Sequence, residues 1–67
     1  MEQFNQLISF FGSQAEVART LNVSTAAVSQ WVEAGGLPAK RAIQMERITK
    51  GRFKATDIVA PSEKEAI

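Results

Sequence analysis

The sequence predicts an all-α fold of five short helices in a single domain. Apolar residues recur at helical spacing, residues that favour helix ends separate these stripes, and 67 residues leave room for one hydrophobic core. A chain of this size buries only about 60% of its unfolded surface. We therefore expect an idealised helical core, self-association, or both.

The residue types that are missing exclude several classes of function. With no cysteine and no histidine, the chain has no disulfide, no thiolate or imidazole zinc ligand, no imidazole base and no thiolate nucleophile. The seven acidic residues are scattered, so we expect no enzyme, no cofactor or metal and no small-molecule ligand. No apolar run approaches the ~20 residues of a membrane span. We expect neither a signal segment nor a membrane partner, and a cytoplasmic location.

The first two helices are predicted from an apolar stripe and a capping motif. A stripe at helical spacing predicts a helix over residues 2–11, and it consists of Phe4, Leu7, Ile8 and Phe11. Gly12 then favours the left-handed conformation of a helix end. Ser13 and Glu16 form a capping box, which predicts a second helix over residues 14–21.

The third helix is predicted over Thr25–Ala34. Asn22 favours a left-handed cap after the second helix, and the Ser24 hydroxyl can cap the third. Val28 and Trp31 lie three residues apart, so both are expected in the core. A Gly-Gly pair at residues 35–36 ends the helix.

The C-terminal third of the chain is less strongly determined. Pro38 suits the first turn of a fourth helix, expected over residues 39–50 and ended by Gly51. The segment 52–60 is compatible with a fifth helix or with a strand, so an α+β fold with a C-terminal β-hairpin stays open as an alternative. We expect residues 61–67 to form a disordered tail.

The net charge of +1 hides an asymmetry along the chain. Residues 1–39 carry one cation and three acids, residues 40–54 carry six cations and one acid, and residues 55–67 carry one cation and three acids. A basic band followed by an acidic tail is typical of a solvated helix surface or of a face that meets an anionic partner.

Two short predicted helices joined by a three-residue turn form the centre of the chain. For such helices to cross at roughly 90–120°, the first must be small at the crossing, which Ala18 provides. The turn needs a left-handed residue, Asn22, and an apolar residue that packs inward, Val23. The second helix must direct apolar side chains back toward the first, and Val28 and Trp31 are placed to do so. All of these occur in order, a pattern typical of a helix-turn-helix.

The residues of this motif also carry a family resemblance. The stretch QAEVARTLNVSTAAVSQWVE resembles the helix-turn-helix of the Cro family of phage repressors, especially its all-helical members and related small prophage regulators of antitoxin type. The flanks FFGSQAEVA and ITKGRFKATDIVAP are similar too. The resemblance implies a lambda-repressor-like DNA-binding domain over residues 1–60. Asn22 departs from the family, where glycine is commoner, and some members carry a C-terminal hairpin.

The docking geometry of a helix-turn-helix indicates which residues meet DNA. A recognition helix reads base edges with outward residues near its N-terminus, which here are Ser24, Thr25, Ala26, Ser29 and Gln30. An amide such as that of Gln30 can bond bidentately to adenine. The candidate backbone contacts are Gln14, Lys40, Arg41, Lys50 and Arg52. Apolar residues in excess of a small core are candidates for a dimer interface: Phe53, Ile58 and Val59.

Two functions from different classes follow. The leading hypothesis is a sequence-specific transcriptional repressor that docks the helix Thr25–Ala34 in the major groove of a pseudo-palindromic double-stranded operator, as a homodimer at least on DNA. It would associate with the nucleoid of a bacterial cell through DNA binding. The alternative is an antitoxin-like interaction module that neutralises a protein partner through the fourth helix and residues 52–67.

Overall fold

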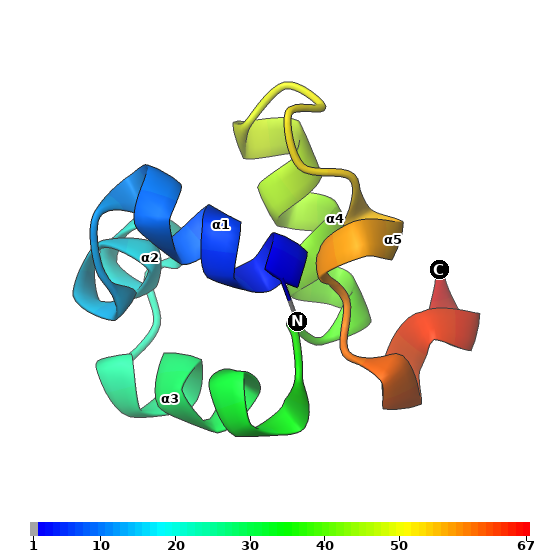
Figure 1. The fold of residues 1–67 in the computed structure, drawn as a ribbon, viewed down its shortest axis with the longest axis horizontal. Helices are drawn as coiled ribbons and strands as arrows, with labels where there is room; N and C mark the ends of the chain where they lie inside the picture. The colour runs from blue at the N-terminus through cyan, green and yellow to red at the C-terminus, as the bar shows by residue number, and fades with distance from the viewer. Residues whose placement is uncertain (1) are drawn as a thin grey trace.

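Helices account for nearly all of the regular structure in this computed structural model, which describes residues 2–67 (Figure 1). The elements are α1 (Glu2–Phe11), α2 (Gln14–Leu21), α3 (Thr25–Ala34), α4 (Ala39–Ile48), α5 (Ala55–Ile58) and a terminal 3-10 helix, η1 (Pro61–Ala66). The predicted all-α fold is confirmed. The β-hairpin alternative is wrong, because residues 39–48 and 55–58 are helical and the extended pairing within the described chain is one isolated bridge, Leu37 to Val59.

Local capping explains where the helices begin and end. The Ser13 hydroxyl accepts the Glu16 N–H at 3.2 Å, and the Ser24 hydroxyl accepts the Ala27 N–H at 3.1 Å, so both predicted hydroxyl caps are confirmed. The second half of the predicted capping box is not formed, because the Glu16 carboxylate instead accepts from the Arg19 guanidinium at 3.1 Å. The fourth helix ends two residues earlier than expected, at Ile48. Lys50 is left-handed with φ 55°, a conformation that turns the chain away from the helix.

The hydrophobic core draws on every α-helix. Its fully buried large side chains are Phe4, Leu7, Val17, Leu21, Val28, Leu37, Met45 and Ile58. The same core also buries Phe53 and Val59. This burial corrects the assignment of Phe53, Ile58 and Val59 to a dimer interface: the monomer already covers all three side chains, so they offer no surface to a second chain.

A backbone strap joins the end of α3 to the segment after α5. The Leu37 N–H donates to Ile58 O and the Ala60 N–H donates to Leu37 O, both at 2.8 Å. Gly36 lies directly against this segment, where an added Cβ would meet backbone atoms of Ile58, Val59 and Ala60 at 2.7 Å. Only a residue without a side chain fits this approach.

The C-terminal segment, residues 61–67, is folded back on α4, whereas its sequence predicted a disordered tail. The Ala39 N–H donates to the Glu63 carboxylate at 2.9 Å. Pro38 makes no side-chain cap for α4, so the first amide of α4 is satisfied by an acid that lies 24 residues away. This bond gives η1 a fixed place beside α4.

Substitution of Gly36 tests the strap. Gly36→Ala is expected to lower the free energy of unfolding by about 3 kcal/mol, because backbone cannot rotate away from the new methyl group. Gly51→Ala is the matched control: it strains a residue at φ 84° whose nearest neighbour would be the flexible Lys54 ammonium at 3.6 Å, at a cost of about 1–2 kcal/mol. Urea unfolding measures both, and equal losses would contradict the close approach.

Substitution of Glu63 tests the cap of α4. Glu63→Ala is expected to cost about 1 kcal/mol of unfolding free energy through the lost bond to the Ala39 amide. Glu65→Ala removes the same charge from the same segment but not this bond, so a change within about 0.5 kcal/mol is expected at a protein concentration where only the monomer is present. Thermal unfolding of the two variants measures both changes in stability. A loss as large for Glu65→Ala would show that charge, not capping, is responsible.

Candidate nucleic-acid interface

The turn between α2 and α3 sets the angle at which α3 leaves the molecule. Asn22 adopts φ 60° and ψ 46°, the left-handed geometry predicted for it. The Val23 N–H then donates to Ala18 O at 2.9 Å, and the Val23 side chain packs against the core. Because Ala18 and Val28 are both buried at the crossing, α3 is held on its inner side alone.

The outer side of α3 is a face of small and polar side chains. Thr25, Ala26, Ser29 and Gln30 are exposed, whereas Val28 is buried. Figure 1 shows α3 along one edge of the molecule. Four of the five predicted base-reading residues therefore lie together with free side-chain surface. The fifth, Ser24, is exposed but uses its hydroxyl oxygen as the helix cap.

A side-chain hydrogen bond joins the two helices of the motif at this face. The Ser29 hydroxyl donates to the Gln14 amide oxygen at 2.9 Å. Gln14 is the first residue of α2, where free backbone N–H groups favour an anion. With its amide oxygen occupied, Gln14 keeps its two amide N–H donors for another partner. The structure thus brings one predicted phosphate contact next to one predicted base contact.

The predicted cationic contacts divide into two groups. Lys40 and Arg41 open α4, directly after the connection Gly35–Pro38 that follows α3. Lys40 is exposed, and the Arg41 guanidinium donates to the Gln44 amide oxygen at 2.8 Å, which braces it along α4. These two residues share the end of α4 that adjoins α3.

Lys50 and Arg52 lie in the loop that follows α4, at the other end of that helix. The ten residues of α4 span about 15 Å, and Figure 1 shows this loop (yellow) at the opposite edge of the molecule from α3. The Arg52 guanidinium instead covers the Phe10 ring, 4.7 Å from its centroid. The structure therefore does not bring Lys50 and Arg52 to the α3 face, a separation that helical spacing alone did not reveal.

The fold and this face define the class of protein. A short helix, a left-handed turn and a second helix with a free outer face form a helix-turn-helix, the unit that places a recognition helix in the DNA major groove. The family described as DNA-binding transcriptional regulator Cro, of the P22 type, matches residues 3–64. The chain therefore belongs to the P22 Cro family of DNA-binding transcriptional regulators, as the resemblance predicted.

Two relatives agree with this assignment. The chain is 46% identical to the regulatory protein cro of Salmonella phage P22 over 48 residues, which are 72% of this chain and 75% of that protein. It is 41% identical over 56 residues to YdaS of Escherichia coli (strain K12), whose name describes a transcriptional regulator; these residues are 82% of this chain and 57% of YdaS. No solved structure matches the chain. None of the helices within residues 2–67 is both long and apolar enough to cross a membrane.

Proposed function

We propose that this chain is a sequence-specific transcriptional repressor that binds a pseudo-palindromic operator as a homodimer. The observation that carries the proposal is the free outer face of α3, where Thr25, Ala26, Ser29 and Gln30 are exposed side by side. A face of this kind enters the major groove with its N-terminal residues against base edges. Occupation of a promoter by such a dimer would block transcription.

The four exposed residues near the start of α3 each have a chemistry that bases can recognise. The Gln30 amide can both donate to and accept from one adenine edge, a pairing worth about 1–3 kcal/mol of discrimination. The methyl groups of Thr25 and Ala26 suit the thymine methyl. The Ser29 hydroxyl is held at the Gln14 amide, so it is already oriented before DNA arrives.

The backbone contacts in this proposal come from the two helix starts beside α3. Gln14 offers its amide N–H donors at the N-terminus of α2. Lys40 and Arg41 supply positive charge at the start of α4. Lys50 and Arg52 are not part of this set, because the loop after α4 that carries them lies at the opposite edge of the molecule from α3 (Figure 1).

Selection from random duplex DNA at about physiological salt tests the proposal. The wild-type chain is expected to recover a two-fold-symmetric motif, and Gln30→Ala is expected to relax the preference at one position of each half-site, by about 1–3 kcal/mol. Gln6→Ala removes an exposed amide from α1 and should leave the motif unchanged. Recovery of no motif would contradict the repressor and favour the interaction module.

The salt dependence of DNA binding tests which cations contact the phosphate backbone. Lys40→Ala is expected to weaken binding to all sequences alike and to reduce the slope of log K against log salt by about one unit, because one phosphate contact is lost. Lys50→Ala removes the same charge outside the proposed interface and should leave the slope within about 0.3 units. Titrations of one duplex at several salt concentrations measure both. Equal changes in slope would contradict the placement of DNA along α3 and the start of α4.

A further inference from the structure

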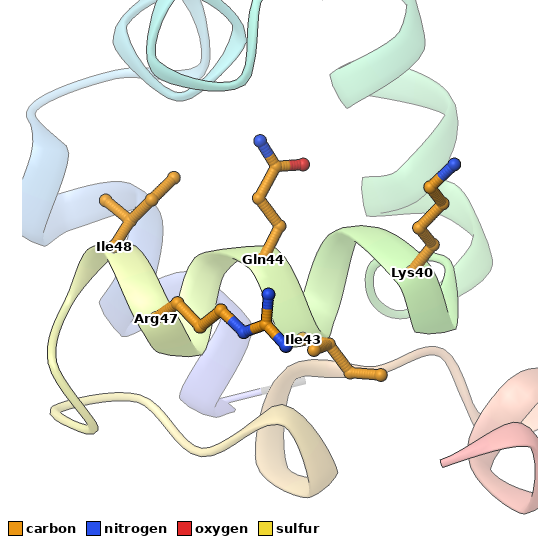
Figure 2. A pocket seen from close by; sticks show the side chains of 5 residues that line it. All are labelled: Lys40, Ile43, Gln44, Arg47 and Ile48. Carbon is orange, nitrogen blue, oxygen red and sulfur yellow. The ribbon is translucent and has the colours of Figure 1, made fainter.

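The outward side of α4 carries an apolar groove that the DNA proposal does not use. Figure 2 shows the groove, a hollow of about 370 Å³ lined by Lys40, Ile43, Gln44, Arg47 and Ile48. Ile43 and Ile48 are 38% and 41% exposed. Two isoleucines left open to water in so small a protein indicate a surface that another chain covers.

The charges around the groove restrict what covers it. The charged residues that line it are Lys40 and Arg47, both cations. Glu46, the acid of α4, instead accepts the Ala55 N–H at 2.7 Å at the start of α5. If two copies of α4 packed against each other, the cations of one copy would lie against those of the other, and like charges repel. An occupant with an aliphatic side chain and acids fits better.

The C-terminal segment of this chain has that composition. Residues 61–67 carry two acids against one cation and end in an isoleucine. Within η1 and the residue after it, Glu65 is exposed and Ile67 is 42% exposed. Glu63 is held at the start of α4 by the Ala39 amide, so the segment is anchored with its outer residues turned to solvent. The segment therefore packs against the same helix, α4, that carries the groove.

We propose that the α4 groove binds the C-terminal segment of a second copy of this chain, with Ile67 against Ile43 and Ile48 and Glu65 against Arg47. The contact is made twice, because each protomer offers one groove and one segment to the other across a two-fold axis. This inference rests on the proposed function in that it supplies the interface of the operator-binding dimer. It replaces the interface that burial of Phe53, Ile58 and Val59 excludes.

Sedimentation equilibrium without DNA is the first test. The wild-type chain is expected to pass from monomer to dimer as its concentration rises. Ile43→Glu and Ile67→Asp, which place acids on the two sides of the contact, should both remain monomeric, with thermal unfolding confirming that each is folded. Gln6→Glu adds an acid on α1 and should dimerise as the wild type does. A wild-type chain that stays monomeric at every concentration would overturn the proposal.

Charge reversal identifies the segment that fills the groove. Because each substitution occurs twice in a two-fold dimer, Arg47→Glu and Glu65→Arg are each expected to raise the dimer dissociation constant by about tenfold. The double variant should recover most of that loss. A double variant that is weaker than either single variant would show that residue 65 does not meet residue 47.

Binding to a duplex with one half-site separates this proposal from the proposed function. Ile43→Glu should bind one half-site as the wild type does and lose only the cooperative binding to a complete two-fold site. A dimer that ignores every duplex would refute the repressor and leave the interface standing. Specific DNA binding with equal cooperativity in the wild type and Ile43→Glu would refute the interface alone.

Discussion

The left-handed turn at Asn22 is the constraint on which the exposed face of α3 depends. A short helix packs well only when its apolar side is covered, and α3 packs chiefly against α2. The turn at Asn22 and the packing of Val23 orient α3 so that its Val28 lies in the same core as Ala18 of α2. The opposite side of α3 is thereby left exposed on a helix that is packed along its inner side, which is what the proposed base recognition requires.

The rest of the chain is held by a few polar contacts that reach across it. The strap between Leu37 and residues 58–60 fixes the connection from α3 to α4, and it works only because Gly36 has no side chain. Two acids satisfy the first amides of other helices: Glu46 for α5 and Glu63 for α4. In a core this small, such contacts decide how α4 and η1 are oriented.

The sequence predicted what neighbouring residues determine and missed what distant residues determine. The hydroxyl caps at Ser13 and Ser24 and the backbone turn at Asn22 are local, since each joins residues at most five positions apart, and all were anticipated. Burial of Phe53 and Val59 follows from packing on other helices, which spacing along one segment does not reveal. The bond from Glu63 to α4 spans 24 residues, so composition alone favoured a disordered tail. The separation of Lys50 and Arg52 from α3 has the same origin, because a charge count ignores the length of α4.

The placement of charge would let the two proposed interfaces share one chain of 67 residues. Lys40 lies at the start of α4 and at one end of the groove, so this cation would adjoin both the proposed DNA face and the proposed contact between protomers. An acidic segment seated in the groove would lower the positive potential at Arg47 and, more weakly, at Lys40, while leaving the outer face of α3 untouched.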